Sequence, residues 1–407
     1  MQSWQPTRAA ALARLELFTP RAGRQYALTR NSDLGPEQRD NVSGISPWLR
    51  YRLISEQEVL AGVLAEHGPK AADKFIQEVL WRTYWKGWLE QRPAVWRWFL
   101  AERDDQRQQA HADFESGKLL NEAEQGQTGI DGFDDWAREL VQTGYLHNHA
   151  RMWFASIWIF TLKLPWSLGA DFFLRHLLDA DPASNTLSWR WVAGLQTRGK
   201  TYLATADNIE YHTNGRFRPR GLAEKADPPD GPAPPEATGL PEAHPETSVD
   251  LTGQVLLLTP EDLNPEKLMA AAGRPAQILI AGPEAFSPDW PWGDKAQAFL
   301  DAAVEDVQTR LQNDHQLPVR RIDSLSAMSL LGLIRPHSVE RILTPYAPVG
   351  PVADVMARLH DELSVHDLGL GLVRRDWDEQ AWPHATSGFF PFRKQIPELL
   401  RRAGLPS

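Results

Sequence analysis

The chain of 407 residues contains no cysteine, so structural disulfides, thiolate metal sites and iron–sulfur clusters are excluded. No apolar run approaches the roughly 20 residues of a membrane-spanning helix, and the N-terminus carries no signal-peptide pattern. We therefore expect a cytoplasmic protein that does not enter membranes. A monomer is a separate expectation. The composition, 42% apolar and 24% charged, is ordinary for a globular protein of two or three domains.

Acidic residues outnumber basic ones, and the formal net charge is −10. The excess is confined to one part of the chain. Residues 1–220 carry 27 Lys and Arg against 26 Asp and Glu, whereas residues 221–407 carry 16 against 27. A near-neutral first half beside an acidic second half is compatible with a local basic groove for nucleic acid, although it does not demonstrate one.

The first half shows helical periodicity and no strand-like alternation. Apolar residues recur at helical spacing in the ranges 75–99, 134–146, 147–164 and 171–178. The sequence therefore predicts an all-α domain over residues 1–220. Residues 221–249 are rich in Pro, Ala and acidic side chains, a composition that cannot bury a core and is typical of an extended linker.

Residues 250–407 change pattern and predict a second, α/β domain. Short apolar runs at 255–259, 278–281, 319–322, 341–344 and 368–373 alternate with helical patterns near 295–312 and 352–363. Such alternation predicts a parallel, Rossmann-like sheet with helices on both faces. This half contains neither GxGxxG nor GxxxxGK[ST], so its glycines do not indicate nucleotide phosphate binding.

Tryptophan is abundant, with 17 in the chain, and most of these side chains are expected in the core. One segment stands apart. Residues 179–194 read DADPASNTLSWRWVAG and place two carboxylates, an amide and two tryptophans in an otherwise apolar helical region. Because buried carboxylates are costly without a partner, the segment predicts a large planar cofactor held by fixed acceptors, with aromatic side chains behind it.

This segment resembles the flavin-binding signature of the DNA photolyase/cryptochrome family. Five motifs follow in the family's order over about residues 24–220, including NVSGISPWLR at 41–50, EVLWRTY at 78–84 and HNHARM at 147–152. The resemblance implies FAD as cofactor. The cofactor-binding residues that it implies are Tyr26, Ser43, Gly44, Ile45, Ser46, Glu78, Arg82, Asn148, Arg151, Asp179, Asp181 and Asn185.

Several of these motifs also have simpler interpretations. Ser46 and Pro47 fit the N-cap and first position of a helix, and Val42 replaces a threonine that the family uses at the flavin phosphates. Glu78 and Arg82 are spaced for a surface ion pair, which would leave Trp81 in the core. The histidines of the 147–152 motif point to different faces of a helix, which argues against a metal site.

The same resemblance assigns catalytic roles to Glu78, Trp81, Arg82, Asn148 and Met152. Trp81 would stack on a pyrimidine dimer flipped out of DNA, a step that is cheapest where pairing is already damaged. Asn148 and Met152 would face the lesion, and the asparagine favours cyclobutane dimers over (6-4) photoproducts. The partner would be UV-damaged DNA, with single-stranded or duplex preference left open. Residues 197–202 would touch DNA phosphates or form a solvated loop.

Trp189 and Trp166 match the proximal and middle members of the family's electron-transfer chain. The family's distal tryptophan would lie near Asp113 and Phe114, where this chain has none. Trp158 and Trp136 are candidates for that place.

The resemblance implies a light-driven deoxyribodipyrimidine photolyase that splits cyclobutane dimers by electron transfer from photoexcited reduced flavin. The alternatives are a cryptochrome-like blue-light receptor without repair activity and a non-catalytic helical protein. An antenna chromophore is left open. Photolyases ordinarily begin with the α/β domain, whereas here the helical domain comes first. Residues 385–393 of the second domain read ATSGFFPFR, similar to a segment that closes the family's α/β domain. We therefore predict a domain-order permutant.

Overall fold

The computed structural model describes residues 4–286, 290, 292–334, 337 and 339–407. From residue 4 to residue 220, the regular elements that the structure describes are all helices, as the periodicity predicts. They are α1 (Arg8–Phe18), α2 (Arg24–Thr29), α3 (Ser46–Arg50), α4 (Glu56–Glu66), α5 (Pro69–Glu90), α6 (Ala94–Ala112), α7 (Phe114–Gln125), α8 (Phe133–Thr143), α9 (Asn148–Ser156), α10 (Trp166–His176), α11 (Pro182–Val192) and α12 (Ala206–His212).

The predicted helical stretch 75–99 divides into α5 and α6 because Pro93 follows the last turn of α5. Proline removes a backbone donor and disfavours helix for the residue before it. Within α5, a Cβ on Gly87 would lie 2.8 Å from the Cα of Trp382. Glycine at this position therefore lets the backbone at Trp382 pack directly on the backbone of α5.

The helical stretch that begins at Asn148 does not stay α-helical. After α9, residues Ile157–Thr161 form a π-helical turn, a feature found mostly as single turns and often near functional sites. This turn lies in the buried centre of the helical half, where Trp158 is fully buried.

A six-stranded parallel sheet forms the centre of the second half. Its strands are β1 (His244–Pro245), β2 (Val255–Leu258), β3 (Gln277–Ala281), β4 (Val319–Ile322), β5 (Arg341–Pro345) and β6 (Gly369–Arg374). The spatial order is β1-β6-β5-β2-β3-β4, with every described pair parallel. The direction of winding reverses between β2 and β5, as in doubly wound folds. The expected α and α/β architecture is thereby confirmed, and β1 is an additional strand inside the predicted linker range.

The two faces of the sheet pack against different partners. Val255 and Leu257 of β2 belong to a core with α15 (Ala327–Ile334) and α16 (Pro351–Ser364). Leu256 and Leu258 face the other way, into a core with α13 (Pro265–Ala272) and α14 (Asp294–Asn313) that continues into the helical half. Because all four β2 side chains are buried, the strand is apolar without alternation.

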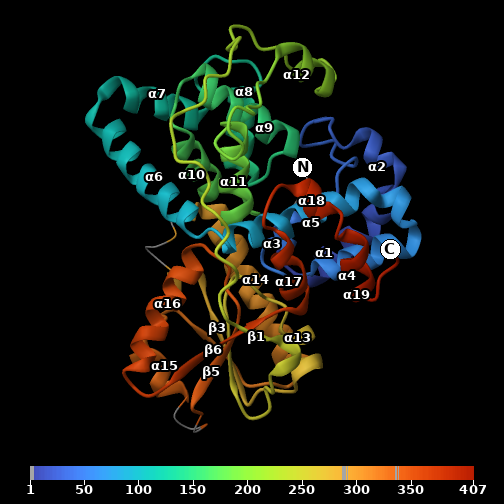
Figure 1. The fold of residues 1–407 in the computed structure, drawn as a ribbon, viewed down its shortest axis with the longest axis vertical. Coiled ribbons are helices and arrows are strands. Elements are labelled where there is room, and N and C mark those ends of the chain that lie inside the picture. Colours follow the sequence, from blue (N-terminus) through green and yellow to red (C-terminus); the bar gives the residue numbers. More distant parts are fainter. Residues whose placement is uncertain (1–3, 287–289, 291, 335–336, 338) are drawn as a thin grey trace.

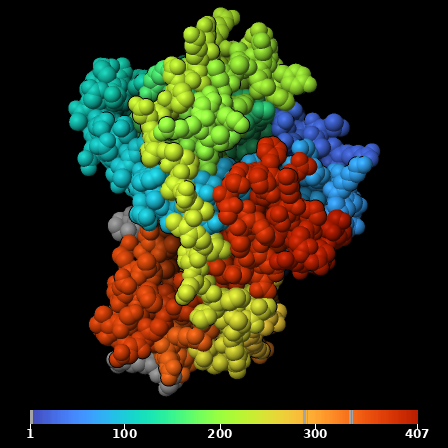
Figure 2. Space-filling model, viewed as in Figure 1, coloured from blue at the N-terminus to red at the C-terminus, as the bar shows by residue number. Residues whose placement is uncertain are grey.

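The last helices leave the sheet and return to the helical half. Figure 1 shows α17 (Asp376–Ala381), α18 (Phe389–Arg393) and α19 (Ile396–Arg402) at the helical half, where α17 and α18 contact α5. Residues 221–243 run along the surface as an extended strip in Figure 2, held where Thr238 N–H donates to the Gln91 carbonyl at 3.0 Å. The proposed boundaries 1–220, 221–249 and 250–407 stay a prediction, and the structure adds that elements within residues 376–393 pack on α5.

Candidate flavin site

The turn at residues 179–181 is the centre of the candidate site. Asp181 is the N-cap of α11, and its Oδ1 accepts a 2.8 Å hydrogen bond from Ser184 N–H. Pro182 follows at the first helical position, where its missing N–H costs nothing. Asp179 and Asp181 are 5% and 1% exposed, so this short turn places two carboxylates inside the protein.

Asp179 is held by a cation and a hydroxyl from two other elements. Arg151 of α9 approaches Asp179 Oδ2 at 2.9 Å through Nη2. Burial acts to raise the pKa of Asp179, but Arg151 and a hydrogen bond from Ser46 outweigh it and leave the pKa lowered. The predicted residues Ser46, Arg151 and Asp179 therefore meet at one place around an ionised carboxylate.

Asp181 lies among cations of α5 and α3. Lys86 Nζ is 3.2 Å and Arg82 Nη1 is 3.9 Å from Asp181 Oδ2. Burial would raise the pKa of Asp181, yet Lys86, Arg82 and Arg50 hold it well below its usual range. Asp181 Oδ2 and Arg82 Nη1 are buried and make no hydrogen bond to another described residue. An acceptor and a donor with unused capacity, side by side, fit the polar edge of a flavin.

Tyr26 and Glu78 form a second group, joined by Arg30. Arg30 Nη1 donates to Glu78 Oε1 at 2.6 Å, and Tyr26 is 8% exposed against Phe75. Burial raises the pKa of Glu78, with Arg30 opposing the rise. The simpler alternative, an i,i+4 ion pair between Glu78 and Arg82, does not form. Glu78 instead accepts from Arg30 of α2, and the Arg82 side chain is directed toward Asp181.

The 43–46 stretch is built differently from the expected cap. The N-cap position of α3 is Ile45, no side chain caps the helix, and Ser46 is its first residue. The hydroxyl of Ser46 is directed to Asp179 instead. Gly44 adopts a φ of +63°, a conformation that glycine reaches without strain. Arg14 fixes the stretch from outside by donating to the Ser43 carbonyl at 2.6 Å.

The expected lesion residues lie on two helices. Glu78 and Trp81 belong to α5, whereas Asn148 is the exposed first residue of α9 and Met152 is half-buried one turn later. Their contact with a lesion stays a prediction. Asn185 donates through Nδ2 to the Ala170 carbonyl at 2.8 Å, which fixes the orientation of its amide.

The aromatic side chains around Trp189 are closely packed. Trp189 lies 6.2 Å from Trp158, centroid to centroid, at an interplanar angle of 84°. A Cβ on Gly169 would overlap the Trp189 ring, so glycine is needed there. Trp166 packs instead on Phe99 at 5.7 Å. At the expected distal position, Asp113 is the N-cap of α7 and Phe114 is exposed.

Four residues that matter for the site escaped the sequence analysis: Arg50, Lys86, Glu261 and Phe389. Lys86 follows Arg82 by four positions on α5, and this spacing indicates that both side chains lie on the same face of the helix. Glu261 and Phe389 approach from more than 170 positions away in the sequence, so local patterning carried no signal for them.

Comparisons with known proteins find a family model and relatives that match part of the chain. Residues 75–230 match the family model described as the FAD binding domain of DNA photolyase. The deoxyribodipyrimidine photo-lyase of Streptomyces griseus is 33% identical over 159 residues, 39% of this chain and 33% of the relative. A deoxyribodipyrimidine photo-lyase of Thermus thermophilus is 34% identical over 236 residues, 54% of this chain and 51% of the relative.

A crystal structure of a bacterial class III photolyase from Agrobacterium tumefaciens aligns with a TM-score of 0.43 and 26% identity, covering 52% of this chain and 43% of that one. This chain spans about half, or less, of the length of these relatives.

The fold and the site define a helical flavin-binding domain coupled to a parallel α/β domain. Through residues 75–230 of this helical domain the chain is related to the photolyase/cryptochrome family, whose cofactor is FAD. Among the helices of the described ranges, none combines the length and apolarity needed to cross a bilayer.

Proposed function

We propose that the chain is a light-driven DNA repair enzyme that splits cyclobutane pyrimidine dimers. Bound reduced FAD would supply the electron on illumination, while the protein supplies binding, orientation and electrostatics. The observation that carries the proposal is the buried 179–181 turn, with Asp179 paired to Arg151 and Asp181 beside Arg82, inside the segment that matches the FAD-binding model. The matched relatives are named deoxyribodipyrimidine photo-lyases.

Each group of residues has its own task in this proposal. The two carboxylates of the turn accept hydrogen bonds from the flavin and Arg82 donates one, with Asn185 beside them. Residues 43–46 and Tyr26 hold the phosphates. Trp81 and Glu78 take the extruded base, with Asn148 and Met152 opposite. UV-damaged DNA is the proposed partner, and the permuted domain order is part of the same proposal.

A blue-light receptor without repair activity is the second candidate, and one observation favours it. Phe389 of α18 is stacked on Trp81, so one face of the proposed base-stacking ring is already covered. A receptor would keep the flavin pocket and need no lesion pocket.

Illumination of the flavin-reduced protein with dimer-containing oligonucleotides tests the proposal, in single-stranded and duplex form. We expect light-dependent dimer splitting and none in the dark. An Asp179→Ala variant without bound flavin serves as a matched protein control. A yellow, photoreducible protein that splits neither substrate would contradict repair and leave the receptor function.

A further inference from the structure

Glu261 connects the α/β half to the candidate flavin site through two buried cations. It lies in the loop that follows β2, and its carboxylate accepts two hydrogen bonds from Arg50, at 2.7 and 2.9 Å. Its Oε2 also lies 3.6 Å from Lys86 Nζ. The side chains of all three residues are between 1% and 3% exposed, so solvent does not screen these contacts.

Both partners of Glu261 hold the 179–181 turn. Arg50 Nε donates to the carbonyl of Ala180 at 2.7 Å, between the two aspartates of the site. Lys86 Nζ lies 3.2 Å from Asp181 Oδ2. One carboxylate of the α/β half therefore fixes the two cations that bracket this turn.

We define the 181 cluster as Arg50, Arg82, Lys86, Asp181 and Glu261. It contains three cations and two carboxylates, packed within 4 Å contacts in the interior. A buried cation that loses its counter-ion is strongly destabilised, so Glu261 makes it possible to keep Arg50 and Lys86 beside the turn. Although burial opposes it, Glu261 and Asp181 raise the pKa of Arg50, so this side chain stays charged.

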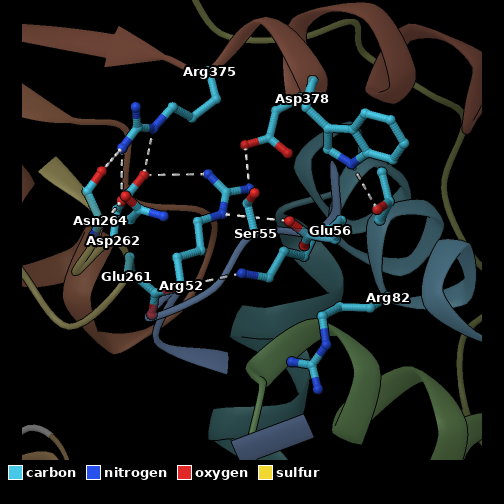
Figure 3. Close-up of polar contacts among 12 residues, drawn as sticks. Arg52, Ser55, Glu56, Arg82, Glu261, Asp262, Asn264, Arg375 and Asp378 are labelled. Carbon is cyan, nitrogen blue, oxygen red and sulfur yellow. Dashed lines mark hydrogen bonds and ion pairs between the residues drawn. The ribbon is translucent and has the colours of Figure 1, made fainter. Parts of the chain in front are cut away.

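Asp262, the next residue on the same loop, belongs to a separate network. It bonds Arg375 through both oxygens, at 2.7 and 2.9 Å, and lies 3.5 Å from Arg52. Figure 3 shows Arg52 and Arg375 turned toward Asp262, with Arg82 on the other side of the view. The loop therefore carries two adjacent carboxylates, of which Glu261 alone is joined by described contacts to cations of the 179–181 turn.

We propose that Glu261 is a positioning residue of the flavin pocket: it fixes Arg50 and Lys86 around the 179–181 turn and sets the charge that the bound flavin meets. A flavin gains negative charge on reduction, and nearby charge tunes its reduction potential. Removal of Glu261 leaves the 181 cluster more positive and favours reduced flavin. Removal of Lys86 leaves the 181 cluster more negative and favours oxidised flavin. The inference rests on FAD binding at this site and not on repair of DNA.

The test compares two nearly isosteric changes of opposite sign in the full-length, FAD-loaded chain. The midpoint potential of bound flavin is measured by reductive titration against indicator dyes. Glu261→Gln is expected to shift the equilibrium at least tenfold toward reduced flavin, about 30 mV for a two-electron couple. Lys86→Gln is expected to shift it in the other direction.

Asp262→Asn is the matched control, because it removes the same charge from the neighbouring position of the loop and is expected to give a much smaller shift. Shifts of the same sign for Glu261→Gln and Lys86→Gln would overturn the inference, as would a potential unchanged by either. So would an Asp262→Asn shift equal to that of Glu261→Gln.

A further variant covers the case in which Glu261→Gln does not fold or loses its flavin. Glu261→Asp keeps the charge and shortens the side chain by one methylene. It is expected to retain flavin with a potential close to that of the unmodified chain. A Glu261→Asp potential displaced by tenfold or more toward reduced flavin would show that charge is not the cause and would overturn the inference.

The outcome is separable from that of the proposed function. If the unmodified chain binds flavin but splits no dimer, only the repair proposal fails, and the potentials of the variants still decide the role of Glu261. If the unmodified chain repairs DNA and the Glu261→Gln potential does not move, only the present inference fails.

Discussion

Phe389 lies face to face with Trp81, with ring centroids 3.7 Å apart and an interplanar angle of 12°. The two residues lie far apart in the sequence, on α18 and α5. Phe389 is 5% exposed and also packs on Tyr84 and Phe392. Helix α18 is therefore packed against Trp81, a residue that the proposed function places at the lesion.

Removal of this ring is expected to destabilise the protein. Phe389→Ala should lower the free energy of unfolding by about 3–5 kcal/mol, since it deletes a buried aromatic side chain. Phe390, the next residue, is 76% exposed, so Phe390→Ala should change stability by less than about 0.5 kcal/mol. Urea unfolding measures both. Equal effects of the two substitutions would contradict the packing described for α18.

Asp179→Asn should release flavin. The substitution removes the buried carboxylate that pairs with Arg151, whose side chain is 23% exposed, so the cost should lie at the lower end of the about 2–5 kcal/mol typical of a fully buried charge pair. The affinity for FAD should fall at least tenfold, as measured by the ratio of flavin to protein after gel filtration. Asp207→Asn is the control, because the Asp207 side chain is 88% exposed. A full complement of flavin in Asp179→Asn would reject this turn as the cofactor site.

The sequence predicted those parts of the fold that local patterning determines. The apolar runs became β2 to β6, and the helical periods became α5, α8, α9, α10, α14 and α16. The divided stretch at Pro93 was also readable from the sequence. β1 was not predicted because its two residues, His244 and Pro245, are too few to show an alternating pattern. Only their pairing with β6 makes them a strand.

Partners of charged residues were harder to predict than their positions. Asp179 pairs with Arg151 of α9 and accepts from Ser46, and Glu78 pairs with Arg30 on α2 and not with Arg82, four positions along its own helix. The choice depends on which helix packs against which face of α5. Tertiary packing decides this, and no local spacing encodes it.

Glu90, at the end of α5, should make stability depend on pH. Burial raises its pKa to about 7, against the hydrogen bonds from Tyr346 Oη and Val349 N–H, which act to lower it. The folded state therefore holds a proton that the unfolded chain releases near pH 4.5. The resulting stabilisation is complete below about pH 4.5 and is lost as the pH rises through about 7.

Glu90→Gln mimics the protonated form and should remove this dependence. Relative to the unmodified chain, the variant should gain about 3 kcal/mol in free energy of unfolding between pH 4.5 and pH 7.5. Urea unfolding at several pH values measures the difference. Glu66→Gln, at an exposed position of α4, is the control. Parallel profiles for Glu90→Gln and the unmodified chain would contradict a protonated Glu90.

The aromatic neighbours of Trp189 lead to a prediction about light-driven reduction of bound FAD. The family resemblance makes Trp189 the residue that gives up the first electron, and the Trp158 ring lies 6.2 Å from it. Trp136 packs instead on Trp153, at 5.4 Å. Trp158→Phe should therefore slow flavin photoreduction severalfold, whereas Trp136→Phe should leave the rate nearly unchanged. Each substitution keeps an aromatic ring in the core but deletes a buried hydrogen bond, from Trp158 Nε1 to the Pro165 carbonyl at 2.9 Å or from Trp136 Nε1 to Asp33 Oδ2 at 3.2 Å. Both variants should therefore lose about 1–3 kcal/mol of stability, and the comparison of their bleaching rates is matched in this respect.

The rate of flavin bleaching under blue light, with an external thiol as reductant, measures the effect. Trp189→Phe removes the first electron donor to the flavin, so it serves as the reference for an interrupted electron-transfer path and should slow bleaching most. A Trp158→Phe variant that bleaches at the unmodified rate would remove Trp158 from the path. The electron that refills oxidised Trp189 would then be expected to arrive through Trp166, which packs on Phe99, a ring that in turn contacts Trp96 at 5.3 Å. Since Trp96 Nε1 donates to Asp354 Oδ2 at 3.2 Å, beside a cavity of about 370 Å³, Trp96→Phe is the substitution that would test this second route.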